Sequence, residues 1–231
     1  MFDDLLICCL NDENWPRAIA YARSLAPSSG GRTTVLVRKA ADLSLVDADA
    51  STRVVHCRSG LAESIGFHAA WADVVVIDAP AALADLESIL CDGGRPCAVL
   101  PFGARTPAPP RRIAVGWNGS LESMRALKAA LPLLRRAEHV VVLDAGRKSH
   151  EMCDATPCAA TWLAERGIFA ARVRSDSAAQ GGRTLVELAA EHAVDLLVLG
   201  AYRHQRFTEW DTGATLDQVL RDGDIPVLLG H

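Results

Sequence analysis

The sequence predicts an α/β fold built from two related domains in one chain. Ten short apolar runs are spaced along the 231 residues, and helical patterns lie between most of them. Most runs are continuously apolar, which is typical of strands in a parallel sheet covered on both faces. Alternating strands and helices favour βαβ units with right-handed crossovers. The second half of the chain also repeats features of the first, which indicates a duplicated domain.

Five apolar runs define the strands expected in the N-terminal half. They are LLICCL (5–10), TTVLV (33–37), RVVHC (53–57), DVVVID (73–78) and CAVLP (97–101). Only RKAADLSLVDADAST lies between the second and third runs, which leaves little room for a full helix. The sequence therefore predicts a reduced domain over residues 1–104.

Five further runs define the strands expected in the C-terminal half. They are RIAVGW (112–117), HVVVLD (139–144), FAARVR (169–174), DLLVLG (195–200) and IPVLLG (225–230). The segment between the halves, GARTPAPPRR (103–112), is rich in proline and indicates a linker. We therefore expect a second domain over residues 110–231.

One helix of the second half is predicted in more detail. Met124, Leu127, Leu131 and Leu134 recur at three- and four-residue intervals and predict one apolar stripe. Ser120 is placed to cap the start of this helix, and Pro132 is expected to bend or break it. The apolar stripe is expected to face the sheet rather than a membrane.

Three pairs of segments match between the halves. Residues 3–19 align with 111–127, 72–78 with 194–200, and 93–101 with 223–231. Between the last two pairs the first half is eight residues shorter. The missing stretch corresponds to GAYRHQRFTEWDTGAT (200–215), whose glycines are spaced across a polar loop between a strand and a helix. The first domain is therefore expected to lack this loop.

With these motifs the chain resembles a tandem universal stress protein, in which two domains of that family are fused. The resemblance is strongest over 111–143 and 194–220 and weaker in the first half. It implies two flavodoxin-like (adenine nucleotide alpha hydrolase-like) domains, each a five-stranded parallel sheet flanked by helices. Family dimers pair through their last strands, so the resemblance implies intramolecular pairing of the two domains. It is also compatible with further association into a homodimer.

Many members of the family bind ATP through a loop written G-x2-G-x9-G-(S/T). In this chain the loop starts at Gly200, places Arg203 at the second glycine and Gly213 at the third, and has Ala214 where serine or threonine is usual, with Thr215 one residue later. Two of the four signature positions therefore depart from the family pattern. The resemblance implies an adenine nucleotide site in the second domain. Besides the loop, that site would include Gly116, Trp117, Asn118, Leu143 and Leu199.

The departures leave two interpretations of this site open. Backbone N–H groups of residues 213–215 can still face an anion at a helix start. Arg203 can either fill the phosphate position or pair with phosphate through its guanidinium. Asn118 stands where ATP-binding members usually have aspartate; it can bond a nucleoside or, with Gly119, simply make the turn after the strand. The loop is thus either a modified nucleotide site or a relic.

Composition and charge disfavour other classes of protein. The formal net charge is −4, which argues against nucleic acid or an anionic membrane as partner. No basic, signal-like start and no apolar run of transmembrane length is present. The seven cysteines, an odd number, are expected to be reduced thiols in the cytoplasm.

No catalytic or metal-binding motif stands out. His150, Cys153 and Cys158 form an H-x2-C-x4-C pattern that does not match a standard zinc site, so we expect no metal there. A redox pair of Cys153 and Cys158 stays open, because the spacing alone fixes no geometry. The resemblance implies a non-enzymatic regulatory or binding protein of the stress response. The alternatives are a ligand-free interaction scaffold and a slow ATPase or phosphotransferase.

Overall fold

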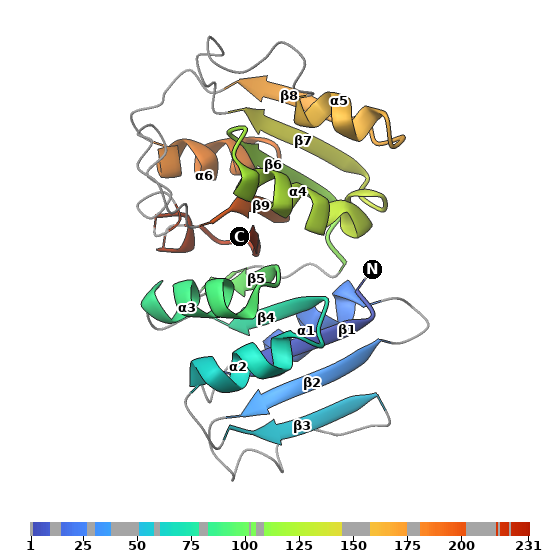
Figure 1. The fold of residues 1–231 in the computed structure, drawn as a ribbon. Helices are drawn as coiled ribbons and strands as arrows, with labels where there is room; N and C mark the ends of the chain where they lie inside the picture. Colours follow the sequence, from blue (N-terminus) through green and yellow to red (C-terminus); the bar gives the residue numbers. More distant parts are fainter. Residues whose placement is uncertain are drawn as a thin grey trace. The chain divides into compact units, whose positions relative to one another are not determined.

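A computed structural model gives the fold of the chain (Figure 1). It describes residues 2–9, 15–26, 31–37, 51–57, 61–78, 83–101, 103–104, 109–144, 158–174, 181–201, 216, 218–221 and 223–231. The chain divides into two compact units, Met1–Pro109 and Pro110–His231, here called unit 1 and unit 2. The second unit begins at Pro110, inside the proline-rich segment expected to link two domains.

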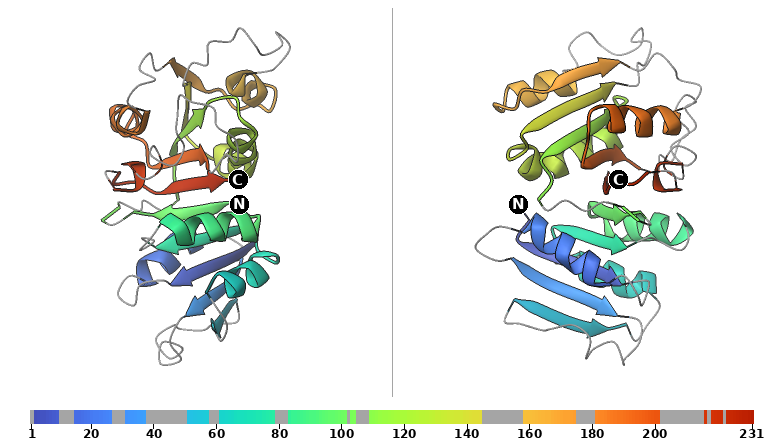
Figure 2. Two further views of the ribbon diagram at one scale, coloured as in Figure 1. Left: turned by 60° about the vertical axis from the view of Figure 1, so that its left-hand side comes forward. Right: turned by 180° about the vertical axis from the view of Figure 1, so that it is seen from behind.

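Unit 1 is built on parallel strands with helices on both faces. Its elements are β1 (Asp4–Cys9), α1 (Trp15–Leu25), β2 (Arg32–Val37), β3 (Thr52–His56), α2 (Leu61–Ala69), β4 (Val74–Asp78), α3 (Leu83–Gly93) and β5 (Cys97–Leu100). The strand order is β3-β2-β1-β4-β5, and every ladder between these strands is parallel. Helix α1 covers one face of this sheet, and α2 and α3 cover the other (Figure 2).

Unit 2 repeats this plan. Its elements are β6 (Arg112–Trp117), α4 (Leu121–Leu134), β7 (His139–Asp144), α5 (Ala159–Ala164), β8 (Ala171–Arg174), α6 (Gly181–Glu191), β9 (Leu196–Gly200) and β10 (Val227–Gly230). The order is β10-β9-β6-β7-β8, again with parallel ladders. Helices α4 and α5 lie on one face and α6 on the other (Figure 2). The predicted α/β class with a parallel sheet is confirmed.

The predicted strands are all found, but two of them begin two residues later than predicted: IPVLLG gives a strand only from Val227. The run FAARVR gives a strand only from Ala171 onward, and Phe169 before it is 86% exposed. The segment between β2 and β3, where no full helix was expected, lies mostly outside the described residues. Most of the other strands are largely buried because their continuous apolar side chains pack against helices on both faces; the edge strand β3 is the exception, with only Thr52 buried.

An aspartate joins the first and fourth strands in the same way in each unit. In unit 1 an oxygen of Asp73 accepts the backbone N–H groups of Asp3 and Asp4 at 2.8 and 3.0 Å. In unit 2 the carboxylate of Asp195 accepts the N–H groups of Arg111 and Arg112. Asp73 and Asp195 occupy matching places in the sequence repeat, so the structural repeat extends to individual hydrogen bonds.

Helix α4 begins as predicted but presents a different stripe. Ser120 caps it by accepting the N–H of Ser123 at 3.1 Å. The stripe is rotated relative to the prediction, because Met124 and Leu131 are only half-buried. The buried residues of α4 are Ser123, Ala126, Leu127, Ala130, Leu133 and Leu134.

Pro132 does not break helix α4, contrary to the expectation. The helix continues through it and ends two residues later, at Leu134. A proline in the last turn of a helix interrupts few of the hydrogen bonds that hold the helix together. No helix within the described ranges is both long and apolar enough to cross a membrane.

Candidate functional site

The candidate site lies at the carboxyl ends of β6 and β9 in unit 2. These strands are neighbours, with Val115 opposite Val198, and β6 pairs with β7 on its other side. The chain runs from β6 outward through β7 and β8 on one side, and then crosses to β9 and β10 on the other side of β6. The position between β6 and β9 is therefore a topological switch point. Ligands of open α/β sheets bind outside the carboxyl ends of the strands at such a point.

The segment after β6 forms a tight, hydrogen-bonded turn. Asn118 Oδ1 accepts the backbone N–H of Ser120 at 3.0 Å, and Gly119 has a positive φ of 73°. A positive φ is unfavourable for residues with a Cβ, so glycine suits this position. Asn118 therefore has a structural role in starting α4, as the turn interpretation predicts. Its side-chain amide can still donate to a nucleoside.

Three of the predicted site residues are packed inside unit 2. Leu143 and Leu199 are buried, and a Cβ on Gly116 would overlap the Cδ2 atom of Leu199. Leu185 of α6 also lies within contact distance of that position. The packing of β6 against β9 and α6 thus accounts for the glycine at 116.

Gly200, the first glycine of the predicted loop, lies against helix α4. A Cβ at residue 200 would overlap the backbone nitrogen of Ser123 and the carbonyl carbon of Glu122. Gly230, its register partner on β10, meets the backbone of Ala126 in the same way. Both glycines allow α4 to approach the sheet closely, so Gly200 has a packing role whatever the loop after it binds.

One acidic residue also lies near this edge. Glu122, in the first turn of α4, has a buried Oε2 atom with no hydrogen-bond partner among the described residues. A carboxylate there benefits from the helix dipole. The backbone and Cβ of Glu122 lie against Gly200.

A second polar cluster joins the end of β7 to the neighbouring strand β8. Trp117 is buried and stands opposite Asp144 in the β6–β7 register. Asp144 Oδ2 accepts the Nε–H of Arg172 at 2.9 Å and also pairs with its Nη2. Sequence reasoning did not identify this ion pair. The signal was an aspartate ending one apolar run and an arginine inside the next.

Cys158 lies near this cluster, at the N-cap of α5. Its sulfur is 3.1 Å from Thr161 Oγ1. The hydrogen bond from the Thr161 side chain, then that from its backbone, lowers the pKa of the Cys158 thiol, and Arg172 contributes in the same direction. Cys153 and His150, its predicted companions, lie outside the described residues. Those described residues contain no cluster of three or more His, Cys, Asp or Glu side chains able to hold a metal ion.

Unit 1 fills the corresponding edge with an ion pair. Asp78, which occupies the place of Gly200 in the repeat, is only 1% exposed. Arg17 Nη2 donates to Asp78 Oδ1 at 2.5 Å and to the carbonyl of Pro101 at 3.0 Å, and Nη1 donates to the carbonyl of Ala104 at 3.4 Å. The arginine thus closes the carboxyl edge of unit 1 with groups of the protein itself.

The remaining predicted site residues cannot be placed. Arg203, Gly213, Ala214 and Thr215 all lie outside the described residues. The structure describes the chain again at residue 216 and at 218–221, which are helical. Whether Arg203 fills or holds the phosphate position therefore stays a prediction from the sequence.

Comparisons with known proteins give the fold. No protein-family model matches the chain, and no curated protein matches it in sequence. A universal stress protein from Archaeoglobus fulgidus DSM 4304 matches 98% of this chain and 97% of its own at a TM-score of 0.65 and 13% identity.

Two proteins of Pseudomonas aeruginosa are similar to the same extent. A functionally unknown protein from strain PAO1 has a TM-score of 0.65 and 15% identity. A putative universal stress protein from strain UCBPP-PA14 has a TM-score of 0.64 and 15% identity. Each match covers 98% of this chain and 92% of the other. The chain therefore has the α/β fold found in universal stress proteins.

Proposed function

We propose that this chain is a universal stress protein-like binding protein of the cytoplasm that acts in regulation rather than in catalysis. The observation that carries the proposal is the full-length structural likeness to proteins of that name. The repeated aspartate arrangement of Asp73 and Asp195 supports a tandem of two flavodoxin-like domains with five strands each. The family resemblance adds pairing of the two domains through their last strands, with a homodimer as a further step.

The proposed ligand is an adenine nucleotide at the carboxyl edge of unit 2. Support comes from the switch point beside β6, from the Asn118 turn that starts α4, and from the glycine-spaced segment 200–215 that follows β9. In this proposal Arg203 and the backbone N–H groups of residues 213–215 face the phosphates. The matching edge of unit 1 is occupied by the Arg17–Asp78 pair, so unit 1 takes no nucleotide.

A ligand-free scaffold is the second candidate, and two observations favour it. Gly116 and Gly200 are each explained by the packing of helices and strands. Glu122, whose backbone and Cβ lie against Gly200, adds an acidic residue to the first turn of α4 near this edge, which disfavours a triphosphate. Under this candidate the segment 200–215 is kept for shape alone, and no nucleotide copurifies with the chain.

One titration series separates these functions. ATP is titrated calorimetrically into the natural chain, Arg203→Gly and the double variant Arg203→Gly/Ala214→Ser. If Arg203 holds phosphate, the single variant binds about ten-fold or more weakly, since a charge-assisted contact is lost. If Arg203 fills the site, only the double variant gains binding. No binding by any of the three favours the scaffold, and release of ADP during the titration favours a slow ATPase.

A further inference from the structure

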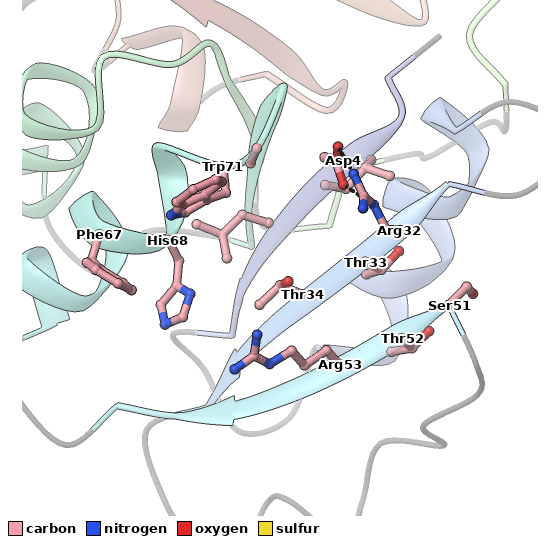
Figure 3. A pocket seen from close by; sticks show the side chains of 13 residues that line it. Asp4, Arg32, Thr33, Thr34, Ser51, Thr52, Arg53, Phe67, His68 and Trp71 are labelled. Atoms are coloured by element: carbon pink, nitrogen blue, oxygen red, sulfur yellow. Dashed lines mark hydrogen bonds and ion pairs between the residues drawn. The ribbon is translucent and has the colours of Figure 1, made fainter.

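A cavity of about 630 Å³ opens in unit 1, whereas nucleotide binding is proposed for unit 2 (Figure 3). Its floor is formed by the amino-terminal halves of β1, β2 and β3, and its wall by the end of α2 and the turn into β4. The opposite edge of the sheet holds the Arg17–Asp78 pair. The cavity is therefore separate from the site described above.

Side chains from two directions face one another across the cavity. Phe67, His68 and Trp71 come from α2 and the turn after it, while Thr34 and Arg53 come from β2 and β3 (Figure 3). Thr34 is opposite Arg53 in the β2–β3 register, so both lie on the same face of the sheet. The rings of Phe67 and His68 meet edge to face, with centroids 5.3 Å apart.

The fold does not require this aromatic wall. Phe67 is 70% exposed and Trp71 is 78% exposed, so neither contributes much to the core. The alignment of 72–78 with 194–200 can be extended toward the N-terminus without a gap. In this alignment all three wall residues correspond to alanines of unit 2, namely Ala189, Ala190 and Ala193.

Backbone hydrogen bonds support this alignment of the two units. The N–H of Trp71 bonds the carbonyl of His68, and that of Ala193 bonds the carbonyl of Ala190. The two helix ends thus share this hydrogen bond, with small side chains in unit 2 and large ones in unit 1. The turns differ after it, because Ala193 has a positive φ of 49° and Trp71 does not. Exposed aromatic groups that the fold can do without commonly mark a binding surface.

The charges in the cavity favour an anion. Asp4 and Arg32 neutralise each other through two hydrogen bonds of 2.7 and 2.8 Å. Arg53 forms no ion pair with another described residue, so its guanidinium is the surplus charge of the lining. Burial, and then the nearby Arg53, lowers the pKa of His68, which favours the neutral imidazole.

We propose that the cavity binds a small aromatic carboxylate, with its ring against Trp71 and its carboxylate held by Arg53. A guanidinium matches the two oxygens of a carboxylate through parallel hydrogen bonds. An indole ring offers a flat apolar surface for stacking. The volume lies within the range of about 300–1,000 Å³ that is usual for small-molecule sites. Phe67, His68 and Thr34 border the ligand and limit its size.

The test compares a charged probe with its neutral isostere. Calorimetry on the full chain is done with 2-naphthoate and with 2-naphthamide, in the absence of nucleotide. We expect the acid to bind once per chain and about ten-fold more tightly than the amide. Arg53→Gln should abolish that difference, while Arg53→Lys should keep part of it. Trp71→Leu should weaken acid and amide alike by several-fold, through loss of stacking.

Matched substitutions in unit 2 serve as controls. Phe169→Ala removes an equally exposed aromatic ring, and Arg135→Gln removes an exposed arginine; both should leave naphthoate binding unchanged. The proposal is overturned if the natural chain does not bind naphthoate at millimolar concentration, if the amide binds as tightly as the acid, or if Arg53→Gln and Trp71→Leu leave binding intact. Because every residue that lines the cavity belongs to unit 1, failure here leaves the nucleotide proposal for unit 2 standing.

Discussion

At the scale of single residues, Arg17 and Asp78 form an ion pair whose removal can be tested directly. Arg17→Met leaves Asp78 buried without its partner, and breaking a buried pair from one side costs about 3 kcal/mol or more. The double variant Arg17→Met/Asp78→Leu leaves no charge behind and should recover most of this loss. Urea unfolding of natural, single and double variants measures the difference. Equal losses in the single and double variants would contradict the ion-pair account.

The same aspartate predicts a specific pH dependence. Burial raises the pKa of Asp78 above its usual 3.8, and Arg17 offsets this only in part. The folded chain therefore binds this proton more tightly than the unfolded chain does. The resulting stabilisation is complete below the unfolded pKa and is lost as the pH rises through the folded pKa. The natural chain should thus gain stability relative to Asp78→Asn between pH 7 and pH 4 in urea unfolding. A constant or opposite difference would show that Arg17 dominates.

The cysteines are expected to react at very different rates. Cys8 and Cys97 are buried in strands, and burial strongly raises the pKa of the Cys97 thiol. Cys158 is half-exposed, and its pKa is lowered by hydrogen bonds from Thr161. Iodoacetamide followed by peptide mass spectrometry should label Cys158 first, because the thiolate is the reactive form. Thr161→Val should slow that step, and early labelling of Cys8 or Cys97 would contradict the burial of β1 or β5.

At the scale of elements, the contact of α4 with the sheet depends on Gly200. Gly200→Ala forces a Cβ into the backbone of Ser123 and should cost about 1–3 kcal/mol of stability. Gly94→Ala is the control, since nothing lies within 4 Å of its Cβ and only its positive φ adds strain. Thermal or urea unfolding gives both values. If Gly200→Ala leaves stability unchanged but impairs ATP binding, the glycine serves the ligand rather than the helix.

The strands could be predicted from the sequence because their apolar runs are short and alternate with helical patterns, which is typical of a parallel sheet covered on both faces. The start of α4 could also be predicted, since Ser120 and the N–H it accepts are three residues apart. The buried stripe of α4 could not, because it depends on how closely the helix approaches Gly200 and Gly230. Glycine spacing has two physical causes, ligand approach and helix packing, and the sequence alone does not separate them.

At the scale of the whole molecule, the two units share a plan but have been specialised differently. The repeated hydrogen bonds of Asp73 and Asp195 hold corresponding strands together. Around this frame, unit 1 carries Asp78 where unit 2 has Gly200. The sequence repeat indicated the shared frame. It did not reveal the Arg17–Asp78 pair, whose partners are 61 residues apart and meet only in the folded unit.

This asymmetry predicts the stoichiometry of nucleotide binding. If the chain binds ATP, it should bind one molecule per chain, because Arg17 already fills the carboxyl edge of unit 1 with contacts to Asp78, Pro101 and Ala104. Native mass spectrometry of the full chain with ATP counts the bound molecules.

Arg17→Met/Asp78→Gly removes the ion pair and tests whether it alone excludes a ligand. Without a counterpart of the segment 200–215, unit 1 should still bind no phosphate, so the count should stay at one. Two ATP molecules on the natural chain would contradict the closure of unit 1, and two on the double variant alone would show that the ion pair is the whole barrier.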